Sequence, residues 1–563
     1  MLNADDRRWF AERAANSEQS IWFQDVGAPL ELSALERVAV AQFIFRCFDG
    51  EADRASLPSS VLLDEAPRIV FVSASDGESQ ARTVLGTGFG LCSALEAALR
   101  DFHGPRPQWV KMDLVQKAVA AKHVQANLQH DWFGLAFAAD RHLACTPEQF
   151  ALFSAAARRR AAALLQDVSI EKFKLLTSSF FADGQYIVPL YRGHAWFLEY
   201  SADSLFQSAV AAGDYLKRAV RPNGKFDYVY RAHADSCKSD YNILRHAGTI
   251  YAMLELYETT GDNELLAAAS RAIRYLLRRT KSLGNKRCVV ESAEVKLGGN
   301  SLAILALAKF TQVTGNNEHL RAAVRLARWI RHMQASDGRF IAHKQSFPKG
   351  EISDFTSEYY VGQAIFALLM LYRCDPRKAW VDVAEAATLD LIERRDANVR
   401  DEHLILDHWL LYGLAELHRL RPRALYLQHI DRLIREAVAR QRRKTKYPDW
   451  VGGYDDPPQA TRTACKSEGL CAIYPIVKDF GTLEQQKTVL ECIGLAVRFQ
   501  LRLQINPALA MLLPNPRRAL GAFRNRFSKF DVRIDFVQHN ISSLLGAYRI
   551  ARELGSQSVR ARN

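Results

Sequence analysis

The amino-acid sequence predicts a mainly helical protein in which six helical hairpins close into an (α/α)6 toroid, preceded by an α/β domain. Apolar helices recur about every 50–70 residues beyond residue 200. A more charged, amphipathic helix precedes each of them, and short turns, several with glycine, join the two kinds. We therefore expect an α/β accessory domain over residues 1–165, a connecting segment over 166–202 and the barrel over 203–563.

Helix and strand patterns are mixed in the first 165 residues. The expected elements are a helix over 30–48, strands over 68–73 and 81–85, a helix over 91–102 and a strand over 108–115. A glycine-rich segment, Gly86-Thr-Gly88-Phe-Gly90, separates the second strand from its helix. Its GxGxG spacing differs from the dinucleotide-binding and P-loop patterns, so a tight structural turn is favoured over a phosphate-binding loop.

Six helices that are apolar nearly all round are expected to form the inner ring. They begin near Arg245, Gly299, Glu358, Asp407, Ser467 and Gln538. The outer helices are expected over 203–220, 263–279, 317–335, 376–395, 424–441 and 483–503. A helix buried on every side needs neighbours on every side, and a closed ring supplies them without the capped ends of a solenoid. An open superhelical array of helix pairs is the alternative.

The composition is that of a folded protein, with 48% hydrophobic and 24% charged residues. The 75 Lys and Arg residues exceed the 62 Asp and Glu residues, and the net charge of +13 favours an acidic ligand. Basic runs at 158–160, 440–446 and 517–529 stand beside no RNA-binding motif, so solvated faces are expected and nucleic-acid binding is not.

The cysteine pattern and the hydropathy predict a cytoplasmic protein. The nine cysteines form no CxxC pair, which is typical of a reduced protein. The N-terminal segment has no apolar signal region, and no stretch is apolar over the about 18 residues that a membrane span requires.

Polar residues gather where the inner helices begin. Long loops lead into all six helices at one end of the ring, so these side chains are expected to converge on one mouth. Carboxylates and imidazoles there suit general acid/base catalysis. The candidate catalytic residues are Glu358, Asp407, Glu468, His246, His408 and His539. The candidate substrate-binding residues are Arg245, Tyr241, Asn300, Tyr359, Trp409 and Gln538.

Each candidate has a competing structural role. Asp407 and Ser467 could cap helix N-termini, and Glu358 and Glu468 could serve the helix dipole. Arg245-His246 could be a paired element of the core. The histidines would otherwise carry protons, Arg245 would orient an anionic group, and the aromatic rings of Tyr359 and Trp409 would either stack on a sugar or pack in the core.

No metal or cofactor is expected. His403 and His408 are five positions apart, whereas two ligands on one helix face are four apart. Cys465 and Cys471 flank Glu468 at a spacing of six, which is unusual for zinc ligands.

The arrangement over about residues 200–555 resembles the six-hairpin glycosidases and the N-acylglucosamine 2-epimerase class, most closely at Arg245-His246 and at Thr463–Leu470 (TACKSEGL). The resemblance implies a sugar-binding cavity, with a carboxylate pair for glycosidic cleavage or His and Glu for epimerisation. Lanthionine cyclases share the toroid, but their zinc signature of a Cys and a Cys-His pair is missing. The DxDD of terpene cyclases is missing too, since Asp455-Asp456-Pro457 does not replace it.

The sequence is interpreted as an intracellular carbohydrate-active protein, serving polysaccharide metabolism. It would bind a saccharide, acidic or neutral, at the barrel mouth and act by hydrolysis, lysis or epimerisation. The alternatives are a non-catalytic scaffold that binds a glycan or peptide, and a lanthionine-cyclase-like enzyme that modifies peptides.

Overall fold

The computed structural model describes residues 24–25, 30–100, 102, 104–120, 136–137, 142–145, 173–191, 193–196, 200–445 and 447–560. They fall into two compact units. The first comprises residues 1–196 and 507–516, and the second comprises residues 197–506 and 517–563. The expected connecting segment, 166–202, holds strands of the first unit's sheet because β7 (Phe173–Ala182) pairs along β4 (Trp109–Ala120). The return of residues 507–516 to the first unit was not predicted.

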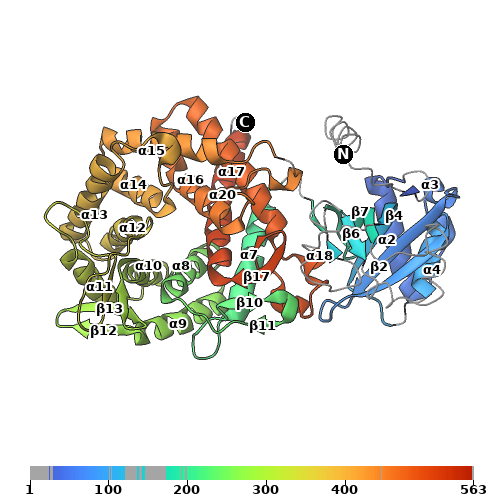
Figure 1. The fold of residues 1–563 in the computed structure, drawn as a ribbon, viewed down its shortest axis with the longest axis horizontal. Helices are drawn as coiled ribbons and strands as arrows, with labels where there is room; N and C mark the ends of the chain where they lie inside the picture. The colour runs from blue at the N-terminus through green and yellow to red at the C-terminus, as the bar shows by residue number, and fades with distance from the viewer. Residues whose placement is uncertain are drawn as a thin grey trace. The chain divides into compact units, whose positions relative to one another are not determined.

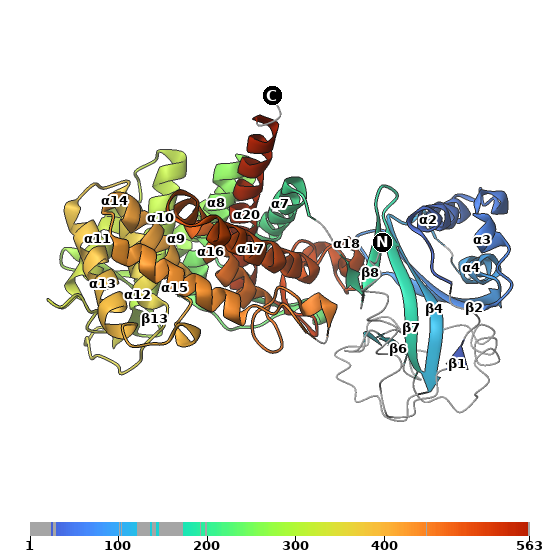
Figure 2. The same ribbon diagram turned by 90° about the horizontal axis from the view of Figure 1, so that it is seen from above.

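The first unit is an antiparallel sheet covered by helices on one face (Figure 2). The main strand order is β3 (Arg82–Phe89), β2 (Pro67–Ser75), β4, β7, β6 (His142–Cys145) and β5 (Ala136–Phe137). Three short strands join its margins, β1 (Gln24–Asp25), β8 (Ile187–Tyr191) and β9 (His194–Ala195). Alternate strand residues such as Val72, Met112 and Phe180 share one buried cluster with α2 (Ala34–Asp49) and α4 (Leu91–Arg100).

The glycines after the second predicted strand let α4 approach β3. A Cβ atom on Gly86 would lie 2.0 Å from the carbonyl oxygen of Ala94, and Gly90 turns the chain with φ +84°. The N-terminus of α4 is already occupied, because the Leu91 N–H donates to the Asp64 carboxylate at 2.9 Å. Asp64 is paired in turn with Arg68 at 2.8 Å. The expected tight turn is therefore formed by Gly90 alone, whereas Gly86 and Gly88 lie within β3 and let α4 pack closely against it.

The six inner helices of the second unit form a closed ring (Figure 1). They are α8 (Ile243–Thr260), α10 (Leu297–Thr314), α12 (Tyr360–Tyr372), α14 (His408–Leu420), α16 (Ala460–Phe480) and α20 (Ile534–Arg560). Each packs against the next in this order, and α20 packs against α8. This last contact distinguishes a toroid from an open array, and it confirms the predicted (α/α)6 architecture.

The outer helices lie against the inner helices as the charge pattern predicted. They are α7 (Ala202–Ala219), α9 (Asn263–Arg278), α11 (Leu320–His332), α13 (Lys378–Asp390), α15 (Ala424–Arg440) and α17 (Leu483–Leu503). Gly261 and Gly315 end α8 and α10 in the left-handed conformation, with φ +68° and +70°. The predicted turns at these glycines are thereby confirmed.

One predicted helix start is wrong. α16 begins at Ala460 and not at Ser467, because the polar segment Thr461–Lys466 continues the helix. Ser467 therefore caps no helix, and Glu468 lies near the middle of α16, away from the N-terminal dipole.

Several of the loops that lead into the inner helices carry small sheets. β10 (Val229–Arg231), β11 (Ser236–Cys237), β16 (Arg524–Arg526) and β17 (Lys529–Arg533) form one, and β12 (Thr280–Leu283), β13 (Lys286–Glu291), β14 (Glu294–Lys296) and β15 (Lys344–Ser346) form another. Short helices α3 (Ser59–Leu62), α18 (Pro507–Ala510) and α19 (Pro516–Ala519) lie elsewhere in the chain. Among the described residues, no helix is both long and apolar enough to cross a lipid bilayer.

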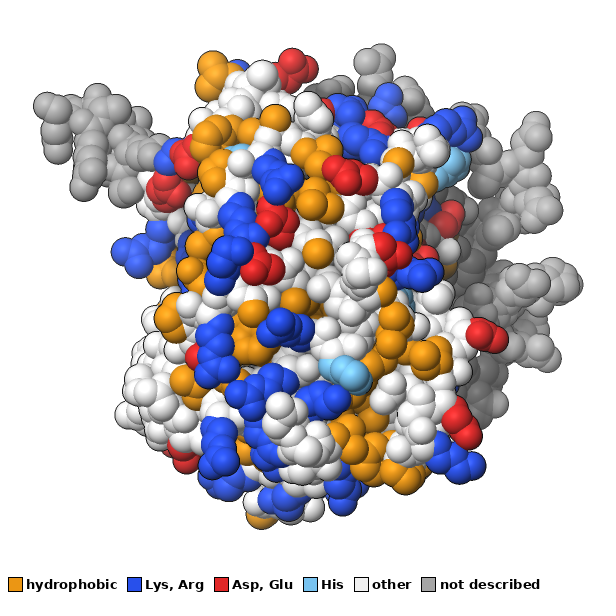
Figure 3. All heavy atoms as spheres, turned by 90° about the vertical axis from the view of Figure 1, so that its left-hand side faces the viewer, with side chains coloured by type: hydrophobic (Ala, Val, Ile, Leu, Met, Phe, Trp, Pro, Cys, Tyr) orange, Lys and Arg blue, Asp and Glu red, His pale blue; other side chains and the backbone are white. Residues whose placement is uncertain are grey.

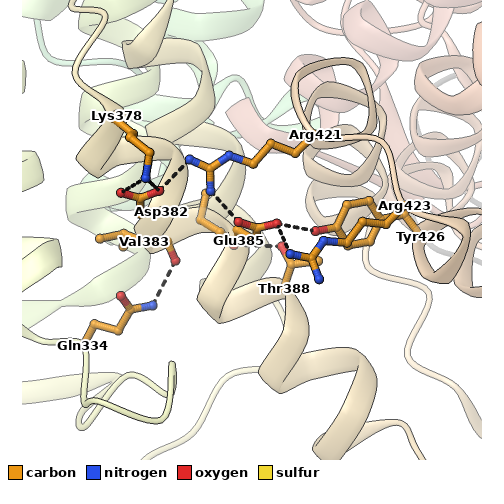
Figure 4. A network of polar contacts seen from close by, with 10 residues as sticks. Gln334, Lys378, Asp382, Val383, Glu385, Thr388, Arg421, Arg423 and Tyr426 are labelled. Carbon is orange, nitrogen blue, oxygen red and sulfur yellow. Dashed lines mark hydrogen bonds and ion pairs between the residues drawn. The ribbon is translucent and has the colours of Figure 1, made fainter.

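An ion-pair network fixes α13 against the turn between α14 and α15 (Figure 4). The Arg421 guanidinium bridges Asp382 and Glu385 of α13. Arg423 lies 2.8 Å from Glu385, and the Tyr426 hydroxyl donates to the same carboxylate at 3.2 Å. This network joins two successive hairpins on the outside of the ring.

Candidate active site

Three neighbouring inner helices bring Glu468, His408 and His539 together. His539 Nδ1 of α20 lies 3.2 Å from Glu468 Oε2, and His408 Nε2 of α14 lies 3.1 Å from Glu468 Oε1. The two imidazole centroids are 5.0 Å apart with the rings nearly perpendicular, at 89°. α14 and α20 both pack on α16, which explains how residues so distant in sequence meet around one carboxylate.

The cluster is enclosed on one side and partly open on the other. The side chains of Glu468 and His408 are 1% and 4% exposed, whereas that of His539 is 12% exposed. Cys465, one helical turn before Glu468, is also partly exposed. One ring nitrogen of each histidine and the Cys465 Sγ atom all lie within 4.8 Å of one another. The cluster is therefore least buried on the side of Cys465 and His539.

Burial sets the proton affinities within the cluster. It raises the pKa of Glu468 to about 7, and the facing His539 only partly opposes this. Burial also lowers the pKa of His408 well below its usual value, so this ring is neutral. Burial opposes protonation of His539, but the adjacent Cys465 and Glu468 hold the pKa of its ring well above the usual value. Glu468 can thus exchange a proton near neutral pH, as a general acid or base requires.

Asp407 precedes His408 and caps the N-terminus of α14. Its Oδ1 accepts the Trp409 N–H at 2.9 Å, which caps α14. Burial raises the pKa of Asp407 to about 7, although nearby Arg395 opposes this. The other carboxylate oxygen packs against α12, where a Cβ atom on Gly362 would lie 2.1 Å from it. The structure therefore supports the capping role that competed with catalysis.

His246 is not brought to the cluster. The fully buried ring lies between the Tyr241 hydroxyl, at 2.7 Å from Nδ1, and the Ala272 carbonyl of α9, at 2.9 Å from Nε2. Both nitrogens are therefore used, and the ring faces the outer helix. The expectation that His246 carries protons and Tyr241 binds substrate is not supported by these positions, because each is a partner of the other.

Arg245 lies in the first turn of α8. Its Nε is 3.0 Å from Asp535 Oδ2, and its Nη1 donates to the Tyr228 hydroxyl at 2.8 Å. The side chain remains 35% exposed. Arg245 thus forms a partly exposed ion pair that joins α8 to α20. Its expected role in orienting an anion stays a prediction.

Two further candidates have side chains that are used in structural contacts. Asn300 is fully buried in α10, where its Oδ1 accepts the Val289 N–H at 2.9 Å and its Nδ2 donates to the Lys296 carbonyl at 2.8 Å. Gln538 is 3% exposed and lies against α8, with its side-chain amide 2.7 Å from where a Cβ atom on Gly248 would be. Both amides occupy helix contacts and not a mouth.

The two aromatic candidates differ in their exposure. Trp409 is 3% exposed and lies among the rings of Tyr251, Phe366 and Tyr412, which is a packing position. Tyr359 is partly exposed, and its ring centroid is 6.1 Å from that of His408.

Glu358 is exposed in the loop before α12. Of the predicted site residues outside the cluster, Tyr359 and Trp409 have rings beside its imidazoles, and Tyr359 is the more exposed of the two.

Sequence reasoning missed Cys465 as a member of the cluster. It also missed Glu255, whose charge helps to raise the pKa of Glu468. Glu255 is 5% exposed in α8 and accepts from the Ser542 hydroxyl at 2.6 Å. A charged residue inside the apolar run MLELYE was an available signal. Cys465 carried no such signal, because its partners come from two other helices.

One hollow among the described residues lies away from the cluster. It measures about 300 Å³ and lies between α7, α8 and α9, where Thr260 marks the far end of α8. It therefore belongs to the end of the ring opposite the loops that lead into the inner helices.

Several residues of the basic runs are ion-paired. Arg442 lies 3.0 Å from Asp456, Arg443 lies 2.7 Å from Glu491, and Arg518 lies 3.0 Å from both Asp227 and Asp235. Figure 3 shows one face of the second unit, on which basic side chains are interspersed with acidic and apolar ones. The run at 158–160 lies outside the described residues. The expectation that nucleic acid is not a ligand stays a prediction.

No protein-family model and no curated protein sequence matches the chain. Solved structures do. A D-mannose isomerase is 15% identical, with a TM-score of 0.47 over 62% of this chain and 97% of the other. A cellobiose 2-epimerase from Spirochaeta thermophila is 13% identical, with a TM-score of 0.46 over 63% and 98%. An α-1,6-mannanase from Salegentibacter is 12% identical, with a TM-score of 0.44 over 62% and 99%. At this identity the likeness concerns the six-hairpin fold alone.

Proposed function

We propose that the second unit is an enzyme that moves a proton on a saccharide, with Glu468 as its general acid/base. The observation that carries the proposal is a buried carboxylate, with a pKa raised to about 7, held between two imidazoles of which one, His539, is partly exposed. A group with a pKa near the working pH is the most effective proton carrier.

The partners of Glu468 favour epimerisation or isomerisation over glycosidic cleavage. Cleavage uses two carboxyl groups on opposite sides of the scissile bond. Among the described residues, the two side chains within ion-pair distance of the Glu468 carboxylate are imidazoles. Glu255 acts on its charge as a neighbour but is itself held by the Ser542 hydroxyl. In the proposed reaction, Glu468 takes the proton from the carbon next to the sugar carbonyl, which leaves an enediolate. Glu468 then returns the proton to the neighbouring carbon, or to the same carbon after the enediolate has turned its other face toward Glu468.

The saccharide is assigned from the resemblance of the inner-helix starts to six-hairpin glycosidases and 2-epimerases. Glu468 lies in one of the two segments that carry this resemblance, Thr463–Leu470. The other, Arg245-His246, supplies a half-exposed guanidinium and a histidine that is part of the core.

Proton transfer on a sugar can be tested without knowing the product. The full chain is incubated in D2O with a panel of reducing monosaccharides, disaccharides and uronic acids, and deuterium on carbon is measured by NMR. We expect incorporation into at least one sugar, and Glu468→Gln should slow it by about 10²–10⁴-fold. A wild-type chain that exchanges no carbon-bound proton, or a Glu468→Gln variant that exchanges at the wild-type rate, would refute the proposal.

Two matched variants serve as controls. Glu436→Gln changes another fully buried glutamate, on outer helix α15, where the partner is Arg440 at 2.9 Å. Glu358→Gln changes the exposed glutamate before α12. Both should keep the exchange rate. A scaffold without catalysis would instead bind a sugar in calorimetry, with an affinity that Glu468→Gln alters, and exchange no deuterium.

A further inference from the structure

Three metal-binding side chains meet at the open side of the cluster. The Cys465 Sγ atom, one nitrogen of His408 and one nitrogen of His539 lie within 4.8 Å of one another. They come from α16, α14 and α20, which the closed ring holds side by side. We propose that Cys465, His408 and His539 bind a zinc ion.

The geometry is close to that of a zinc site. With Zn–N bonds of about 2.0 Å and a Zn–S bond of about 2.3 Å, tetrahedral ligand atoms are about 3.3–3.6 Å apart. The donor atoms, which all lie within 4.8 Å of one another, must therefore approach by at most about 1.5 Å when zinc binds. Imidazole nitrogen and thiolate sulfur are donors that zinc prefers.

The buried histidine of the cluster has an unsatisfied ring nitrogen. His408 is 3% exposed, and its Nδ1 has no hydrogen-bond partner among the described residues. A buried polar atom of this kind is usually satisfied, so its isolation points to a ligand that completes it.

The surroundings suit a doubly charged cation. Glu468 contacts both imidazoles, as the carboxylates that orient zinc-bound histidines do. The Cys465 thiolate and the Glu468 carboxylate together balance the charge of Zn²⁺. The nearest lysine, Lys466, turns away and donates to the Leu406 carbonyl at 2.9 Å.

Binding would replace the Cys465 S–H bond by a Zn–S bond and an N–H bond of the protonated His539 ring by a Zn–N bond, and both protons would go to solvent. The His408 ring is already neutral. Three protein ligands leave a fourth position open, as in catalytic zinc sites. This position can take water or a sugar oxygen, and Glu468 remains beside it as the acid/base. The inference names a cofactor for the site of the proposed function, but it does not depend on the substrate.

The metal content of the full chain tests the inference. The protein is produced in zinc-supplemented medium, separated from free metal by gel filtration and analysed by inductively coupled plasma mass spectrometry. We expect one equivalent of zinc per chain in the wild type and its loss in Cys465→Ser. Cys471→Ser, which changes the other cysteine of α16, a buried one, should keep the metal. Glu468→Gln should weaken zinc binding by about 10–100-fold.

Cobalt supplies a second readout that does not require a folded variant. Co²⁺ titrated into wild-type protein freed of metal should give a thiolate-to-cobalt charge-transfer band and the strong visible bands of tetrahedral cobalt. Absence of stoichiometric zinc together with absence of these bands would overturn the inference, and so would equal zinc binding by Cys465→Ser. Metal-free protein in which Glu468→Gln still abolishes deuterium exchange would leave the proposed function standing without the metal.

Discussion

Acid should destabilise the second unit through His246. The ring is fully buried, its Nε2–H donates to the Ala272 carbonyl, and its Nδ1 accepts from the Tyr241 hydroxyl. Burial lowers the pKa of this histidine from 6.5 to about 4, and the charge of Arg279 adds to the effect. Below pH 6.5 the unfolded chain therefore binds a proton that the folded chain refuses, and the free energy of unfolding falls with pH.

The size of this effect follows from the two pKa values. Their difference corresponds to about 3 kcal/mol once the pH is below both, and about 2 kcal/mol of it is lost between pH 7 and pH 5. The contribution is complete above pH 6.5 and disappears as the pH falls toward 4.

His246→Gln isolates the effect, because a glutamine amide can still donate to Ala272 but does not titrate. Urea unfolding followed by far-UV circular dichroism at pH 7, 6 and 5 gives the stability difference between wild type and variant. We expect the wild type to be more stable at pH 7 and this advantage to shrink by about 2 kcal/mol at pH 5. His332→Gln, at an exposed position of α11, should show no such change. An advantage that stays constant with pH would refute the reasoning.

Three further predictions concern the ring and use the same unfolding assay. Gly362→Ala should destabilise the unit by about 2–3 kcal/mol, because its Cβ would lie 2.1 Å from Asp407 Oδ2 and 2.7 Å from the Leu410 nitrogen. As a control, Gly299→Ala should be neutral or stabilising by up to about 1 kcal/mol, because the atom nearest to its added Cβ is 4.0 Å away. Asn300→Ala should cost about 1–3 kcal/mol, because the buried Val289 N–H loses its acceptor; a cost near zero would contradict this. Arg421→Met should lower the free energy of unfolding by about 1 kcal/mol, and by less at high salt, because it breaks two ion pairs of a network. Arg419→Met removes a single pair with Glu416 and should lower it by at most about 0.5 kcal/mol. Equal losses of stability in the two variants would contradict a role for the network.

Helix positions were predictable because hydrophobic periodicity is a local property of the chain. The inner helices are apolar on every side and the outer ones on one side, and these two patterns located all twelve helices within a few residues, except for the start of α16. That start was missed because Thr461–Lys466 is polar and yet continues the helix. The small sheets in the leading loops were missed too, since their strands are only two to six residues long.

The candidate site could be predicted only in part. A polar residue near the start of an apolar helix drew attention to His408, Glu468 and His539, and the structure joins these three. The same signal selected His246, Asn300 and Gln538, whose side chains turn to neighbouring elements and are used there. Sequence gives the position of a residue along its helix, but the rotation of that helix in the ring decides which way the side chain points.

By itself, the sequence determined the repeat, the alternation of enclosed and water-facing helices and hence the toroid, because burial of apolar surface follows directly from composition and period. Only the tertiary structure decided which polar side chains meet. Cys465, His408 and His539 are separated by more than fifty residues along the chain from one helix to the next, and their convergence depends on the contacts of α14 and α20 with α16. No local pattern encodes such a contact, since it arises from the packing of three helices at once.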